Sequence, residues 1–127
     1  MDQAILVENR IDEGREYVKH LQAKGFDVVA GFWLKEFESE RWYLFIASAL
    51  VDQQGPLKAY RLLYEATSDL STPSIEMFQV KLIGLNDPLT QDVLAIQQRY
   101  SGKLPMRYGG PRLGGWDVED AYIYSPQ

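Results

Sequence analysis

The chain has 127 residues, of which 46% are hydrophobic and 24% charged, and its formal net charge is −5. This length and balance are typical of one globular domain and exclude a disordered chain. The absence of cysteine excludes a disulfide scaffold, a thiolate zinc site and a cysteine nucleophile. The excess of acidic residues disfavours a general binder of nucleic acid or of anionic membranes.

The sequence offers no sign of membrane insertion or export. No apolar run approaches the roughly 20 residues that a membrane-spanning helix requires. The chain opens with MDQAILVENR, which lacks the basic-then-apolar order of a signal peptide. Together with the lack of cysteine, this leads us to expect a soluble cytoplasmic protein.

Residues 2–24 predict an amphipathic helix. Apolar or small residues recur at alternating spacings of three and four, which places them on one stripe: Ala4, Val7, Ile11, Gly14, Val18 and Leu21. Gly25 is a natural helix stop. The single histidine, His20, lies just off the stripe, and no local motif supplies the partners of a metal site or a catalytic triad. We interpret it as a boundary residue.

The most apolar and aromatic stretch covers residues 26–51. It reads FDVVAGFWLKEF, then the polar break ESER, then WYLFIASALV. Both halves carry strand-type residues, so the stretch predicts a β-hairpin at the centre of a sheet. Neither face of either strand is consistently polar, so we expect both faces to be covered by helices or by a partner chain.

The remaining elements alternate between helix and strand. Helices are expected over 56–70 and 88–100, the second with Asp87 as its cap. Strands are expected over 76–85, 103–108 and 117–124. We therefore predict one compact α+β (or α/β) domain covering 1–127. It has a single mixed sheet of about five strands and three helices, in the order α-β-β-α-β-α-β-β.

The two expected β-α-β connections predict how the layers are arranged. Right-handed crossovers make the joined strands parallel and place the second and third helices on the same face of the sheet. The first helix then covers either the opposite face or this same face. In the second case, the side of the hairpin that we assign to Trp33, Tyr43 and Phe45 is left open for a partner.

The most unusual local sequence is the loop YGGPRLGGW at residues 108–116. Its glycines let a ligand approach the main chain, and nearby arginines can hold a phosphate or carboxylate. The loop matches neither glycine-rich phosphate-binding motif, so a simple turn between two strands is the favoured interpretation. The candidate ligand-binding residues are Arg107, Arg112, Gly109, Gly110, Gly114, Gly115 and Asp117.

Carboxylates follow this loop at Asp117, Glu119 and Asp120, and Asp52 ends the second expected strand. Such a cluster is able to bind a divalent cation such as magnesium. Edge strands also carry charge simply to stay unpaired, and no motif completes a ligand set. We therefore assign no metal ligand, no cofactor and no catalytic residue.

Aromatic residues are abundant for a chain of this length. Trp, Tyr and Arg dominate the binding energy of many protein interfaces. The candidate interface residues are Trp33, Tyr43, Phe45, Tyr60, Tyr64, Tyr122 and Tyr124.

Three functional hypotheses follow. The leading one is a non-enzymatic interaction or regulatory domain whose partner is a protein, most simply a second copy of itself. The second is an enzyme of phosphate ligands or nucleic acids that uses the glycine-rich loop. The third is a non-catalytic nucleic-acid binder in which the basic residues of 99–112 join Lys58 and Arg61.

Overall fold

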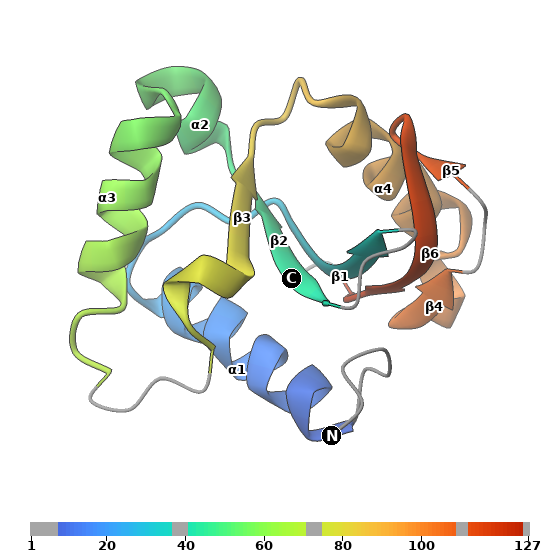
Figure 1. Ribbon diagram of the computed structural model, residues 1–127, viewed down its shortest axis with the longest axis horizontal. Coiled ribbons are helices and arrows are strands. Elements are labelled where there is room, and N and C mark those ends of the chain that lie inside the picture. Colours follow the sequence, from blue (N-terminus) through green and yellow to red (C-terminus); the bar gives the residue numbers. More distant parts are fainter. Residues whose placement is uncertain (1–7, 37–40, 71–74, 109–111, 126–127) are drawn as a thin grey trace.

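The computed structural model describes residues 8–36, 41–70, 75–108 and 112–125 (Figure 1). In chain order its helices, 3-10 helices (η) and strands are α1 (Glu8–Ala23), β1 (Ala30–Glu36), β2 (Tyr43–Ala47), α2 (Ala49–Gln54), α3 (Pro56–Ala66), η1 (Met77–Gln79), β3 (Val80–Ile83), α4 (Pro88–Arg99), η2 (Ser101–Lys103), β4 (Met106–Tyr108), β5 (Arg112–Leu113) and β6 (Trp116–Ile123). No helix in these ranges is long and apolar enough to cross a membrane.

One mixed sheet organises the molecule, which confirms the predicted α+β class. Its strands lie in the order β3-β2-β1-β6-β4, and the short β5 pairs with β6. The predicted hairpin is present, because β1 and β2 pair antiparallel, and β1 is central because it also pairs with β6. As expected for a crossover through α3, β2 and β3 are parallel.

Three predicted strands are shorter than expected: β4 begins at Met106 after η2, and β2 and β3 are shortened by side-chain caps. Residues 48–51 do not extend β2, because Ser48 caps α2 by accepting a hydrogen bond from the backbone N–H of Leu50. Asp27 strengthens this helix start by accepting from the N–H of Ala49 at 2.8 Å. Before β3, Glu76 and Gln79 form a reciprocal capping box around η1. In both places side-chain caps compete with the extended backbone.

Helices cover both faces of the sheet, giving three layers (Figure 1). On one face, Leu21 of α1 and Leu63 of α3 belong to the same buried cluster as Trp33 of β1. On the other face, Leu89 and Val93 of α4 pack with residues of β1, β2 and β6. The prediction that both faces of the hairpin are covered is confirmed, and helices do the covering.

The prediction that the second and third helices share a face is wrong. The chain leaves β3 at one edge of the sheet and returns as β4 at the opposite edge. The pairing directions make β4 antiparallel to β3, so the handedness rule for parallel crossovers does not apply to this connection. The chain crosses the sheet on its second face, where α4 lies.

The strand register also separates residues that we had expected on one side. Trp33 lies opposite Leu44, on the face covered by α1 and α3. Phe45 lies opposite Phe32 on the α4 face, where the two rings stack with centroids 5.3 Å apart. Paired residues of antiparallel strands share a face, so Trp33 and Phe45 point in opposite directions.

The hydroxyl of Tyr124 connects the first helix, the central strand and the end of the last strand. It accepts a hydrogen bond from the Trp33 indole N–H at 2.8 Å and donates to the carbonyl of Ile11 at 2.6 Å. Gly14 makes this approach possible: a Cβ atom there would lie 2.3 Å from the Tyr124 hydroxyl oxygen. Trp33 is fully buried, so its N–H has no access to water.

We predict that Tyr124→Phe lowers the free energy of unfolding by about 2 kcal/mol, because it leaves the buried Trp33 N–H without an acceptor. Urea denaturation measures this loss. Tyr122→Phe is the matched control, because Tyr122 is half-buried on the same strand face and its loss should stay below about 0.5 kcal/mol. Equal losses for the two variants would contradict the role of the hydroxyl.

Alkaline pH should destabilise the protein through two buried tyrosines. Burial raises the pKa of Tyr17 and of Tyr124 from the usual 10.0 to about 12. The unfolded chain therefore loses these protons first, and the free energy of unfolding falls as the pH rises from 10 towards 12. Urea denaturation at several pH values between 10 and 12 measures this decrease in the free energy of unfolding. In Tyr17→Phe the free energy of unfolding should decrease less steeply with pH. An unchanged slope would refute the assignment.

Candidate functional site

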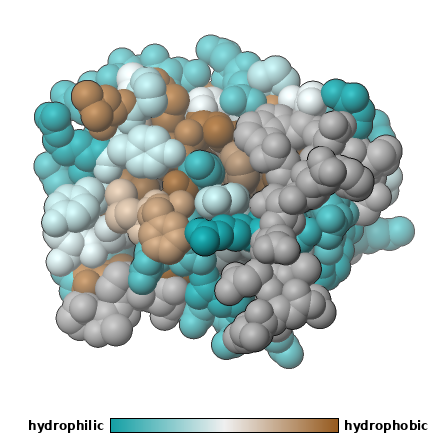
Figure 2. Space-filling model, viewed as in Figure 1, coloured by the Kyte–Doolittle hydropathy of each residue, from teal (hydrophilic) through white to brown (hydrophobic). Residues whose placement is uncertain are grey.

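Exposed apolar side chains gather beside one edge of the sheet. Among the described residues, the large hydrophobic side chains with high exposure are Leu57 at 77%, Tyr64 at 63% and Phe78 at 61%. Leu57 and Tyr64 belong to α3, and Phe78 belongs to η1, which leads directly into β3. Figure 2 shows brown and pale side chains over α3, η1 and β3 on the face in view. We call Leu57, Tyr60, Arg61, Tyr64 and Phe78 the α3–η1 surface.

The helical repeat of α3 accounts for this exposure. Pro56 begins the helix, and Ala59 and Leu63 are buried in the core. Leu57, Arg61 and Tyr64 follow a spacing of four and three residues, which puts them on one stripe facing away from the core. The outer stripe of α3 therefore exposes two large hydrophobic side chains, Leu57 and Tyr64, on either side of Arg61.

Tyr60 joins α3 to the outer edge of the sheet. Its hydroxyl accepts a hydrogen bond from the backbone N–H of Leu82 in β3 at 2.9 Å. At the start of the same edge strand, the N–H of Val80 donates to the carbonyl of Met77. Two backbone donors of β3 are therefore occupied within the chain. A strand added at this edge would find these two donors already used.

The charges of α3 run against its dipole. Lys58 lies in the first turn and Glu65 in the last, whereas the helix dipole favours acidic residues at the start and basic residues at the end. Both side chains are exposed and lie on the same flank of the outer stripe. This order of charges does not stabilise the helix by itself.

The other predicted interface residues lie away from this surface or inside the protein. Trp33, Phe45 and Tyr124 are buried. Tyr43 is half-buried, and the ammonium group of Lys81 lies 4.9 Å from the centre of the Tyr43 ring. Tyr122 packs edge-on against Tyr124. Of the predicted set, the α3–η1 surface contains Tyr60 and Tyr64.

Sequence reasoning missed Leu57 and Phe78. Leu57 lies two residues before the small apolar Ala59, which places it on the opposite side of the expected helix, and that spacing was the available signal. Phe78 falls within the strand expected over 76–85. It is exposed because the chain there forms η1, in which side chains do not alternate.

The glycine-rich loop closes on the protein itself. Gly114 and Gly115 have φ values of +58° and +84° and connect β5 to β6 in a two-residue turn. The N–H of Gly114 donates to the Asp92 carboxylate of α4 at 2.6 Å, so this group already holds an anion of the chain. Arg112 donates to the carbonyl of Gly115 at 3.0 Å. Gly109 and Gly110 lie outside the described residues.

Two acidic residues of β6, Glu119 and Asp120, form ion pairs. Arg107 binds Asp120 at 2.6 Å, and the nearly buried Lys35 binds Glu119 at 2.5 Å. A register shift in β6 opposite Lys35 accompanies these neighbouring acids, as in a β-bulge. Arg107 lies opposite Tyr122 and Arg112 opposite Asp117, which separates the arginines by roughly 15 Å along β6.

The remaining candidates for chemistry are engaged in structural contacts. Asp52 lies in α2 and accepts from the N–H of Leu85 at 2.6 Å. His20 joins α1 to the end of α3, with Nε2 3.0 Å from Asp69, and the Lys24 and His20 side chains lower the pKa of that carboxyl. In the part of the chain that the structure describes, no three histidine, aspartate or glutamate side chains come together as a metal site requires.

Comparison of the chain with protein-family models, curated proteins and solved structures finds no match.

Gly114→Ala should lower the free energy of unfolding by about 3 kcal/mol. An added Cβ would lie 2.3 Å from the Leu89 Cα, and the positive φ adds further strain. Gly115→Ala is the matched control: its φ is also positive, but nothing lies within 4 Å, so we expect a loss of about 1 kcal/mol. Urea denaturation ranks the two variants, and a larger loss for Gly115→Ala would contradict the described packing.

Proposed function

We propose that this chain is an interaction domain that pairs with a second copy of itself through the α3–η1 surface. The observation that carries the proposal is the exposure of Leu57, Tyr64 and Phe78 on neighbouring elements. Large aromatic and aliphatic side chains of this kind form the buried centre of protein interfaces. Arg61 lies between them on the same stripe and is a residue type enriched at such centres.

The charges of α3 favour a second copy as the partner. When two such helices pack antiparallel about a two-fold axis, the start of one lies beside the end of the other. Lys58 of each copy then faces Glu65 of the other, and both lie on the same flank of the stripe. The charge order that opposes the helix dipole becomes favourable, and the pair forms twice in one dimer.

The blocked edge of β3 supports contact through helices. Tyr60 occupies the N–H of Leu82, so adding a strand from another molecule would first require breaking this hydrogen bond. Helix-to-helix packing leaves it intact. The proposed dimer therefore has α3 at its centre and η1 at its rim, with Phe78 covering the second helix.

Charge exchange tests the pairing. We predict that Lys58→Glu or Glu65→Lys alone weakens the dimer, raising its Kd by about tenfold, because each change creates two repulsive contacts per dimer. The double variant Lys58→Glu with Glu65→Lys should return the Kd to the starting value. Sedimentation equilibrium at micromolar concentration measures all four proteins.

Glu16→Lys supplies the matched control. Glu16 is an exposed acid on α1, outside the α3–η1 surface, and its reversal should leave the Kd unchanged. A monomer at all concentrations would refute self-association. A dimer that resists both single reversals would refute the antiparallel arrangement, and Leu57→Asp would then test whether the apolar stripe is used at all.

A further inference from the structure

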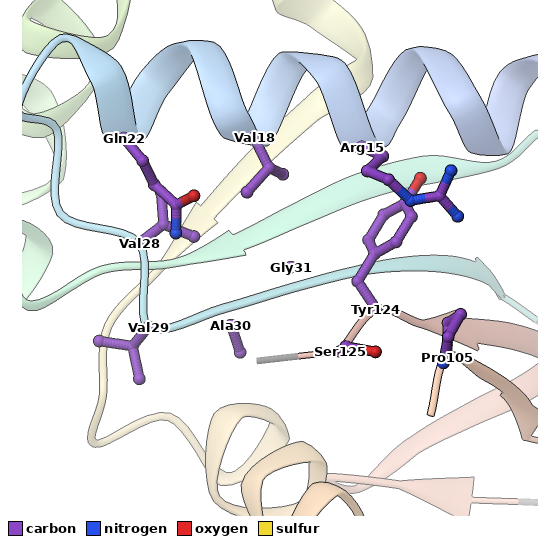
Figure 3. Close-up of a pocket in the computed structure, with 10 residues that line it drawn as sticks. All are labelled: Arg15, Val18, Gln22, Val28, Val29, Ala30, Gly31, Pro105, Tyr124 and Ser125. Atoms are coloured by element: carbon purple, nitrogen blue, oxygen red, sulfur yellow. The ribbon is translucent and has the colours of Figure 1, made fainter. Parts of the chain in front are cut away.

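A second surface feature lies on the other side of α1. A hollow of about 100 Å³ lies between α1 and the start of β1 (Figure 3). Arg15, Val18 and Gln22 point into it from α1, and the residues of β1 form the opposite wall. Tyr124 and Ser125 close one end.

The hollow has an apolar middle and two polar ends. Val18 and Gly31 lie between the ends, and the Tyr124 ring provides a further apolar wall. Arg15 lies at one end and Gln22 at the other, and the Tyr124 side chain lies between Arg15 and Ser125. Arg15 and Gln22 are seven residues apart on α1, so the ends are separated by about 10 Å.

The polar groups at these ends have unused hydrogen-bonding capacity. Arg15 donates through one nitrogen, Nη1, to Asp12 at 2.8 Å, and its guanidinium also lies 5.8 Å from the centre of the Tyr124 ring. Its other N–H groups are held in place by these two contacts. Within the described residues, neither the Gln22 amide nor the Ser125 hydroxyl has a side-chain hydrogen-bond partner. An apolar hollow with a few convergent polar groups is the usual form of a ligand site.

The donors indicate the chemistry of the ligand. A guanidinium has donors but no acceptor, and its planar fork matches a carboxylate. The Gln22 amide both donates and accepts, so it suits a neutral hydroxyl or amide. We propose that this hollow binds a small elongated carboxylate with an apolar body and a neutral polar group at its far end.

This site is independent of the proposed dimer. Arg15, Val18 and Gln22 lie on one side of α1, whereas His20 and Lys24 face the end of α3 from the opposite side. Ligand binding in the hollow therefore does not require self-association. An experiment that disproves the dimer leaves the ligand site untouched, and the reverse also holds.

Hydroxyphenylpropanoate is a suitable probe, because its carboxylate and hydroxyl lie at opposite ends of an apolar ring and chain. Titration of the whole chain, followed by backbone amide NMR, should give saturable shifts at Val28, Ala30 and Gly31 with a Kd on the order of 1 mM. Arg15→Gln should weaken binding at least about tenfold, and so should replacing the carboxylate by its primary amide. Arg99→Gln, an exposed arginine on α4, should have no effect.

A second arm tests the far end. Gln22→Ala should weaken the binding of hydroxyphenylpropanoate. It should leave the affinity for phenylpropanoate, which lacks the hydroxyl, unchanged. Amide spectra of each variant establish that it is folded. The proposal is overturned by the absence of saturable shifts at these amides, by shifts that centre on another surface, or by equal affinity for the acid and its amide. Equal effects of Arg15→Gln and Arg99→Gln would also overturn it.

Discussion

The hydrogen bonds of the Tyr124 hydroxyl set the relation between the first helix and the sheet. The group satisfies the indole N–H of the buried Trp33 and at the same time ties the end of the last strand to the backbone of α1 at Ile11. The helix has to come close for this to happen, and Gly14 is the residue that permits it. If the Trp33 N–H had no acceptor, the loss of free energy would exceed what one hydrogen bond contributes to stability. The Tyr124 hydroxyl therefore fixes α1, β1 and the end of β6 relative to one another.

That constraint determines which surfaces remain outside. With α1 held over β1 and the end of β6, α3 packs beside it over β2 and β3, and its outer stripe faces solvent. The opposite flank of α1 then overhangs the start of β1, where the hollow forms. The α3–η1 surface and the hollow are both consequences of placing two helices on one face of a five-strand row.

Patterns within short stretches predicted the elements well. The stripe of α1, the apolar hairpin and the Asp87–Pro88 start of α4 each depend on neighbours a few residues apart. Ala4 and Val7 of the stripe lie outside the described residues, but its members Gly14, Val18 and Leu21 are buried. The hairpin and the start of α4 are present. The predicted elements were less accurate where a residue distant in the sequence determines the local secondary structure. Residues 48–51 read as strand, but Asp27 binds the start of α2, and a pattern in the second strand contains no information about that carboxylate.

The candidate sites show the same division. The sequence alone determined a mixed α+β domain with a covered central hairpin, and it singled out Tyr60, Tyr64 and the glycine pair at 114–115. Only the tertiary structure decided that Asp92 occupies the Gly114 N–H, that Leu57 and Phe78 are exposed, and that Arg15 and Gln22 border one hollow. Periodicity follows from local backbone geometry, whereas these contacts depend on which face of the sheet each helix covers.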